Sequence, residues 1–199
     1  MTAAQIELDI DTVINRFVQR EALDRYYIEL MKQNESVNLV SRETSRADFD
    51  RLCAESLLPL EALPSRISNY LDIGSGGGFP AIPIILSGRT EGKSLLVERT
   101  LKKASALGRI CGALGITCQV VPRTFEELSP RDRFDLITLR YTKLDRALLK
   151  RVATLLSRDG QFVYYSSYDQ AANEFTMQPY TFTDPVTTAQ KHFTVFRTK

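Results

Sequence analysis

The sequence has few of the residues on which metal binding and covalent catalysis usually depend. Its 199 residues include one histidine, three cysteines and no tryptophan. Cys53, Cys111 and Cys118 form no Cys-x-x-Cys pair, and no cluster of histidine and cysteine has the spacing of metal ligands. We therefore expect free thiols in a reducing compartment and no metal site. A histidine-based catalytic triad would need His192, for which a packed or surface position on a strand is the simpler interpretation.

Long apolar runs are also missing. No run approaches the roughly 20 residues that a membrane-spanning helix needs. The N-terminal stretch "MTAAQIELDIDTVINRF" carries acidic residues where a signal peptide would carry basic ones. These features predict a cytoplasmic protein with no membrane partner. The apolar fraction of 43% and the charged fraction of 25% are ordinary for a globular protein, so we expect one well-buried domain with an appendage, acting as a monomer.

Neither sign of charge dominates the whole chain, but the charges are unevenly distributed. Residues 1–64 contain 7 basic and 12 acidic side chains, whereas residues 65–199 contain 19 basic and 12 acidic ones. Within the second part, the basic residues concentrate between Arg99 and Arg151. We expect this part to meet a polyanion such as nucleic acid, with an ordinary solvated surface as the alternative.

The pattern of apolar residues divides the chain into two regions. Helical spacing in residues 6–31 predicts two amphipathic helices, and residues 44–60 predict a third, so residues 1–64 are expected to form a helical cap. In residues 65–199, short apolar runs alternate with helical stretches. This is typical of βαβ units and predicts a Rossmann-like α/β domain with a seven-stranded, mostly parallel, doubly wound sheet. The expected strands are Tyr70 to Ile73, Leu95 to Val97, Ile116 to Val121, Phe134 to Leu139, Gln161 to Tyr165, and two late strands around Tyr180 and Phe193 to Phe196.

The stretch "YLDIGSGGGFPAIPIIL" begins like a buried strand and ends like a helix. Its glycines fall where the first strand of a parallel sheet turns toward its helix, which is the ligand side of such sheets. Because glycine has no Cβ, this loop can turn sharply and let a ligand come close to the backbone. We expect the following loop residues to contact a cofactor: Gly74, Ser75, Gly76, Gly78 and Phe79.

The spacing within this loop narrows the choice of cofactor. A dinucleotide site needs Gly-x-Gly-x-x-Gly and a Walker loop needs Gly-Lys-Ser/Thr, and both patterns are absent. The loop instead has the pattern Asp-x-Gly-x-Gly-x-Gly from Asp72 to Gly78. A carboxylate two residues before the first glycine would repel phosphates and suits a ligand with an ammonium group or a positively charged sulfur. Asp72 is therefore a further expected cofactor residue.

Two other segments end at the same edge of the expected sheet. Glu98 ends the second strand, at the position from which an acid accepts hydrogen bonds from both ribose hydroxyls. The segment "RTFEEL" follows the third strand, and it places Phe125 to pack on an adenine ring and Glu126 to accept a hydrogen bond from the adenine amino group. Each of the two acids could alternatively be an exposed helix cap.

These motifs resemble those of the class I S-adenosylmethionine-dependent methyltransferases, and more narrowly those of the bacterial small-subunit ribosomal RNA guanine-7-methyltransferases, the RsmG/GidB family. "YLDIGSGGGFPAIPIIL" is similar to the family's strand, loop and helix, and "LLVERTLKKASALGRICGALGI" to its next segment. "NESVNLVSRE" resembles the family's Asn-Leu-Thr turn, and "AESLLPL" its Asp-Ser-Leu helix. "FDLITLRY" matches a strand that ends in Ser-Arg-Ala, so Arg140 stands at the family's arginine.

The resemblance implies an enzyme that binds S-adenosylmethionine and methylates nitrogen 7 of a guanine in 16S ribosomal RNA. Its partner would be small-subunit ribosomal RNA or the ribosomal subunit. Arg140 would be catalytic and donate to the guanine oxygen or a phosphate, with a salt bridge at the strand end as the alternative. Asn38, Lys102, Lys103 and Lys143 would contact the RNA.

Some positions that face the substrate in this family differ here. The threonine of the Asn-Leu-Thr turn is replaced by Val40, and the histidine before the Asp-Ser-Leu helix falls near Leu52. Two alternatives therefore stay open. One is a methyltransferase of the same fold that acts on another RNA or on a small molecule, and the other is a non-catalytic RNA-binding or ribosome-assembly relative.

Overall fold

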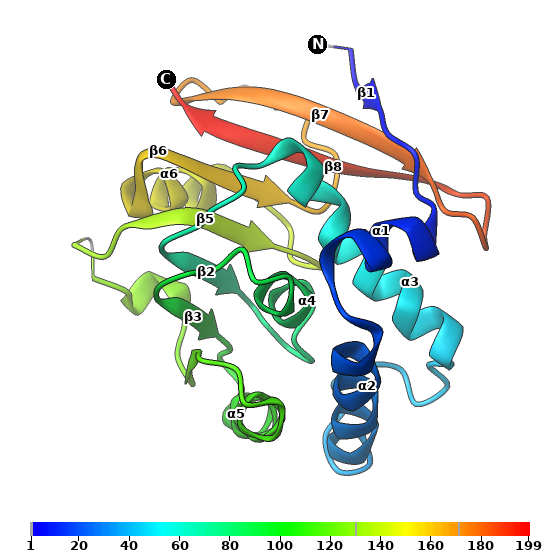
Figure 1. Cartoon of the computed structure of the whole chain (residues 1–199). Helices are drawn as coiled ribbons and strands as arrows, with labels where there is room; N and C mark the ends of the chain where they lie inside the picture. Colours follow the sequence, from blue (N-terminus) through cyan, green and yellow to red (C-terminus); the bar gives the residue numbers. More distant parts are fainter. Residues whose placement is uncertain (1, 130, 171) are drawn as a thin grey trace.

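An eight-stranded sheet runs through the middle of the computed structural model, which describes residues 2–129, 131–170 and 172–199 (Figure 1). The strand order is β1-β7-β8-β6-β5-β2-β3-β4, and the pairs of β8 with β6 and with β7 are antiparallel while the others are parallel. The strands are β1 (Ala4–Gln5), β2 (Tyr70–Ile73), β3 (Ser94–Val97), β4 (Gln119–Val121), β5 (Phe134–Leu139), β6 (Leu156–Tyr164), β7 (Phe175–Thr183) and β8 (Gln190–Thr198).

The helices cover the two faces of the sheet unequally. In the larger core, the helices α1 through α5 pack on one face of the sheet. In the smaller core, α6 packs on the other face. Successive β2 residues alternate between the cores, because side chains along a strand point to opposite faces: Tyr70 lies in the first and Leu71 in the second. The α-helices are α1 (Ile10–Phe17), α2 (Arg20–Asn34), α3 (Arg46–Leu57), α4 (Ala81–Leu86), α5 (Leu101–Leu114) and α6 (Arg146–Leu155), and short 3-10 helices span Leu58–Ala62 and Phe125–Glu127.

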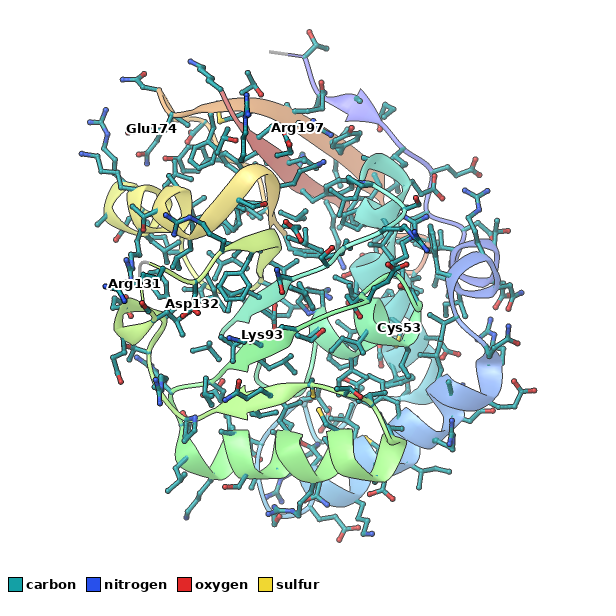
Figure 2. All side chains as sticks on the ribbon, turned by 60° about the vertical axis from the view of Figure 1, so that its left-hand side comes forward. Cys53, Lys93, Arg131, Asp132, Glu174 and Arg197 are labelled. Atoms are coloured by element: carbon teal, nitrogen blue, oxygen red, sulfur yellow. The ribbon has the colours of Figure 1, made fainter. Side chains whose placement is uncertain are left out.

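The N-terminal helices share the larger core with the sheet. Figure 1 shows α1, α2 and α3 grouped beside α4 at one end of the sheet. Tyr26 of α2 and Phe49 of α3 are fully buried, and their rings pack against each other and against Phe79 of the glycine loop. Cys53 of α3, labelled in Figure 2, is also fully buried and carries a free thiol. This packing brings α2 and α3 against the loop that follows β2.

The sheet has the expected architecture, but the number of strands and several strand bounds differ. The strand expected from Gln161 to Tyr165 is β6, which begins earlier, at Leu156, and ends at Tyr164. The expected number of seven strands is wrong by one, because Ala4 and Gln5 pair with Tyr180 and Thr181 of β7 as a short parallel edge strand. The strand expected from Ile116 begins only at Gln119, since the end of α5 continues as a turn in which the amide of Ile116 donates to the carbonyl of Cys111 at 3.2 Å. The N-terminal region therefore contributes a strand as well as helices.

The N-terminal helices begin later than the apolar spacing predicts. Ile6 belongs to the segment beside β7, where its amide donates to the carbonyl of Thr181 at 3.0 Å, and α1 begins at Ile10 after the N-cap Asp9. The helix α3 begins at Arg46, where Ser45 and Asp48 form a capping box. In the described part of the chain, no helix combines the length and the apolar character needed to cross a membrane.

Candidate functional site

The loop after β2 is held by backbone hydrogen bonds to the neighbouring strand. The amides of Gly74 and Ser75 donate to the carbonyl of Val97 at 2.8 and 3.1 Å. Three of the loop glycines have positive φ angles, of 74° at Gly74, 51° at Gly76 and 101° at Gly78, in a region that residues with a Cβ seldom adopt. The expected glycine loop is therefore present, and its glycines stand where the backbone has positive φ angles.

The glycines serve two different purposes. A Cβ on Gly78 would lie 2.6 Å from Cδ1 of Ile82 and 2.9 Å from the hydroxyl oxygen of Tyr26, so this glycine permits close packing inside the protein. A Cβ on Gly74 or Gly76 would meet its nearest neighbouring atom only at 3.6 or 3.8 Å. At these two positions a Cβ would make only ordinary van der Waals contact, and both glycines line a cavity, as a ligand site requires.

Asp72 lies beneath the loop and is 1% exposed. Its Oδ1 atom accepts a hydrogen bond from the Thr138 hydroxyl at 2.5 Å, while its Oδ2 atom is buried without a hydrogen-bond partner among the described residues. Burial raises the pKa of Asp72 to about 7, although the hydrogen bond from Thr138 lowers it. A cationic ligand group near this carboxyl would compensate for its burial.

Glu98 at the end of β3 connects the loop to α5. Its Oε2 atom accepts from the amide of Gly76 at 3.1 Å, and its Oε1 atom accepts from the amide of Thr100 at 2.8 Å. The side chain is 7% exposed and lines both cavities described below. Since a carboxylate offers about four lone-pair sites, it can accept further hydrogen bonds from a ligand. Because Glu98 is buried, it is not an exposed helix cap.

Two adjoining cavities open at the carboxyl ends of the parallel strands. The loop cavity has a volume of about 560 Å³ and includes Gly74 to Gly77, Phe79, Arg140 and Tyr141 in its walls. The Phe125 cavity includes Val97, Phe125 and Glu126. The two cavities share four lining residues, Gly74, Glu98, Lys103 and Thr142. One elongated ligand could therefore lie across β2 and β3.

Arg140 forms part of the wall of the loop cavity, and its guanidinium group is turned toward α3. The guanidinium donates to Oε2 of Glu55 at 2.5 Å and to Oγ of Ser56 at 3.0 Å, and it lies 4.8 and 5.5 Å from the ring centroids of Tyr141 and Tyr165. It also donates to the carbonyl of Leu52 at 3.3 Å. Three of its five N–H donors are thus engaged within the described chain, and Nε–H and one Nη2–H have no partner there. The salt bridge that was the alternative role for Arg140 is present, between Arg140 and Glu55, and it holds the guanidinium group at the wall of the loop cavity.

Arg140 belongs to a larger ionic cluster, which we call the Glu55 cluster: Arg51, Glu55, Arg140, Asp184 and Lys191. Lys191 lies 2.5 Å from Glu55 and 2.8 Å from Asp184, and Arg51 bridges the same two carboxylates at 3.2 and 3.1 Å. Burial raises the pKa of Asp184, but the hydrogen bonds from Lys191 and from two backbone amides outweigh this and lower it. The cluster ties α3 and the end of β5 to the hairpin of β7 and β8.

The comparison with known proteins identifies the family. A model described as rRNA small subunit methyltransferase G (GidB) matches residues 19–193. The chain belongs to this family. Ribosomal RNA small subunit methyltransferase G from Chromobacterium violaceum is 34% identical over 148 residues, which cover 73% of this chain and 69% of that protein. The protein of the same name from Syntrophomonas wolfei is 30% identical over 154 residues, which cover 72% of each chain.

Solved structures agree on the fold of this methyltransferase G family member. An O-methyltransferase from Bacillus cereus in complex with SAH has a TM-score of 0.63 at 14% identity and covers 95% of this chain and 96% of its own. The 16S rRNA N2 G1207 methyltransferase RsmC from Thermus thermophilus, in complex with AdoMet and guanosine, has a TM-score of 0.53 at 21% identity, over 72% of this chain and 43% of its own. The expected class I methyltransferase fold is confirmed.

The residues expected to contact RNA are not gathered in one place. Lys103 is half-buried and lines both cavities, whereas Lys102 and Lys143 are exposed. Asn38 is exposed in the segment between α2 and α3, where its Oδ1 lies 3.5 Å from Nε of Arg42. Among the described residues, no group of three or more histidine, cysteine, aspartate or glutamate side chains could hold a metal ion.

Sequence reasoning missed the residues that attach the N-terminal segment to the loop cavity. The Asn34 side chain accepts from the amides of Leu39 and Val40 at 2.8 and 3.1 Å, and both of these residues line the loop cavity. The Tyr26 hydroxyl donates to the carbonyl of Gly77 at 2.8 Å. The signal available in the sequence was an asparagine at a helix end, which often bonds to nearby backbone amides.

Proposed function

We propose that this protein transfers a methyl group from S-adenosylmethionine to nitrogen 7 of a guanine in small-subunit ribosomal RNA. The observation that carries the proposal is the loop cavity, which joins an open glycine backbone to the buried Arg140 in a member of the methyltransferase G family. The relatives named above carry the corresponding RNA in their names.

The residues present fit S-adenosylmethionine. Gly74 and Gly76 line the loop cavity, as noted above, and Glu98 has acceptor capacity left for ribose hydroxyls. Phe125 lines the second cavity, where it offers an aromatic surface to an adenine ring, and the exposed Glu126 beside it offers an acceptor for the amino group. The unpartnered, buried Oδ2 of Asp72 favours a ligand with positive charge.

The chemistry of this transfer needs little from the protein beyond alignment. S-adenosylmethionine supplies a methyl group bonded to a positively charged sulfur. Nitrogen 7 of guanine carries an in-plane lone pair that forms the new bond without prior loss of a proton, while the sulfur retains the electron pair of the bond that breaks. A catalytic histidine or cysteine is therefore not required, and orientation and placement of charge suffice.

Arg140 is the residue we assign to the acceptor side. Its salt bridge with Glu55 and its hydrogen bond to Ser56 fix the guanidinium plane, and the free Nε–H and Nη2–H can donate to the guanine oxygen or to a phosphate. Lys103 lies at the junction of the two cavities. With the exposed Lys102 and Lys143, it would attract the RNA backbone without regard to sequence, and the exposed Asn38 would contact RNA at the edge of the site.

We also propose that residues 1–64 act as a cap over a methyltransferase domain of residues 65–199, and that the protein works as a monomer in the cytoplasm. In support of the cap, Leu39 and Val40 of the first region line the loop cavity, where Leu39 packs against Gly77. Sedimentation of the purified protein with and without RNA tests the oligomeric state.

The experiment is transfer of a labelled methyl group to unmodified small-subunit ribosomal RNA, as free RNA and as assembled subunits, followed by mapping of the modified base. Arg140→Ala should reduce single-turnover transfer at least about tenfold and leave the affinity for S-adenosylmethionine within about twofold. Arg140→Lys should restore little, because a point charge does not reproduce the planar fork of donors. Arg66→Ala is the control, since Arg66 is an exposed arginine that pairs with Glu91 outside both cavities.

Each alternative outcome has a clear meaning. Cofactor binding with methylation of a different RNA or of a small molecule would contradict the assigned substrate. RNA binding without any transfer would indicate a non-catalytic relative. An Arg140→Ala variant that is folded and fully active would contradict the role of Arg140.

A further inference from the structure

Tyr141 is the most exposed of the large apolar side chains in the described chain. It is 81% exposed, compared with 66% for Leu101, 63% for Val186 and 62% for Ile28. Large aromatic side chains normally bury most of their surface. Its position immediately after Arg140, at the carboxyl end of β5, puts this exposed ring at the wall of the loop cavity.

The backbone of Tyr141 has a conformation that tyrosine rarely adopts. Its φ angle is 58°, and the other described non-glycine residue with a positive φ is Thr188, in the turn between β7 and β8. Glycine or asparagine would adopt this conformation with less strain. Tyr141 lies between the end of β5 and the buried Leu144, whose amide donates to the Tyr164 hydroxyl at 3.5 Å. A bulky ring held there at the expense of backbone strain points to a use at the site.

The ring is supported from the protein side. The guanidinium carbon of Arg140 lies 4.8 Å from the centroid of the Tyr141 ring, and the Glu55 cluster fixes that guanidinium in turn. The high exposure leaves most of the ring surface available. Tyr141 thus presents a flat aromatic surface, supported by Arg140, in the loop cavity rather than in the Phe125 cavity proposed for adenine.

We propose that Tyr141 is the stacking platform for the guanine that accepts the methyl group, an inference that rests on the proposed function. An enzyme that modifies a base removes it from its stack in the RNA, and aromatic side chains replace the lost stacking. Stacking is independent of base identity, so Tyr141 would hold the base while Arg140 recognises its edge. This division of work explains why an exposed ring and a buried guanidinium stand next to each other in the chain.

The test compares Tyr141→Phe, Tyr141→Leu and Tyr141→Ala in steady-state and single-turnover transfer to unmodified small-subunit RNA, with S-adenosylmethionine affinity measured separately. Phe keeps the ring, so its kcat/KM should remain within about threefold of the unmodified protein. Leu and Ala should lower kcat/KM at least about tenfold, with cofactor affinity unchanged. Ile28→Ala, which truncates an exposed apolar side chain of α2, should have no effect.

The outcomes separate the inference from the proposed function. If the unmodified protein binds cofactor but does not methylate the RNA, the proposed function is wrong and the inference falls with it. If the unmodified protein is active and Tyr141→Ala is equally active, the stacking role alone is wrong. The stacking role is also wrong if Tyr141→Leu has the same kcat/KM as Tyr141→Phe, because an apolar side chain without a ring would then suffice.

Discussion

The two walls of the loop cavity are built in different ways. One wall is the glycine loop, whose shape comes from backbone: three positive φ angles, and amides that bond to Val97 and Glu98. The other wall is held by the Glu55 cluster, whose charged side chains come from α3, the residue after β5, the β7–β8 turn and β8. The first wall is formed by consecutive residues, whereas the side chains that hold the second wall come from positions up to 136 apart.

This difference suggests a division of roles. A wall made of backbone changes little with sequence as long as its glycines remain, and it suits a cofactor that is always the same. A wall made of paired side chains can be altered one residue at a time, and it suits the acceptor. Arg140 and Tyr141, which we assign to the acceptor, both lie on the second wall.

Removing Glu55 should have the largest effect on stability. Glu55 is 4% exposed and pairs with Arg140, Arg51 and Lys191. Glu55→Ala leaves the buried Arg140 without a carboxylate partner, whereas Arg51 and Lys191 keep Asp184. Breaking a buried ion pair in this way costs about 3 to 5 kcal/mol of unfolding free energy. Urea denaturation measures this loss of unfolding free energy. Methyl transfer by the folded fraction should also fall, since the guanidinium of Arg140 loses its orientation.

A surface ion pair provides the matched control for this variant. Arg16 and Glu61 lie 2.6 Å apart, with 55% and 28% of their side chains exposed. Because exposed pairs contribute less than about 1 kcal/mol, Glu61→Ala should change stability little. Equal effects of Glu55→Ala and Glu61→Ala would show that the Glu55 cluster does not stabilise the fold.

The contrast between the walls also explains what the sequence could predict. The strands Tyr70–Ile73 and Phe134–Leu139 have the expected bounds, because a short apolar run between turn residues carries its own signal. The glycine loop was predictable for the same reason, since its φ angles follow from neighbouring residue types. The partners of Arg140 and the pairing of β1 with β7 could not be predicted, because neighbouring residue types do not indicate a contact across 85 or more positions.

The glycine wall can be tested by two alanine substitutions that differ in kind. In Gly78→Ala, the new Cβ would overlap Ile82 and Tyr26, and the positive φ adds strain, so the free energy of unfolding should fall by about 2 to 3 kcal/mol. In Gly76→Ala the Cβ makes only an ordinary contact, 3.8 Å from the carbonyl oxygen of Gly74, so stability should fall by only about 1 kcal/mol. Cofactor affinity, measured by calorimetry, should fall in the folded Gly76→Ala protein at least about tenfold.

The reverse pattern would contradict this division of the glycines. If Gly78→Ala is as stable as the unmodified protein, the close packing against α4 is not required. If Gly76→Ala binds S-adenosylmethionine normally, the cavity beside Gly76 is not part of the cofactor site.

Asp72, beneath the glycine loop, gives an effect that depends on pH. Its pKa is raised by burial from 3.8 to about 7 in the folded protein. The folded state therefore binds more protons than the unfolded state between these values, so the stabilising contribution is complete below pH 3.8 and is lost as the pH rises to about 7. Asp72→Asn removes this titration. Between pH 5 and pH 8, the unmodified protein should lose roughly 3 kcal/mol relative to Asp72→Asn in urea denaturation.

Cofactor binding makes this last prediction sharper. A positively charged group near Asp72 favours the ionised carboxyl, so binding at pH 6 should release a proton from the unmodified protein. Calorimetry in two buffers of different ionisation enthalpy measures that proton. Asp72→Asn should release none, while Asp159→Asn, at an exposed aspartate, should match the unmodified protein. If the unmodified protein and Asp72→Asn release the same number of protons, the titrating group lies elsewhere, and the carboxyl beneath the glycine loop does not sense the charge of the cofactor.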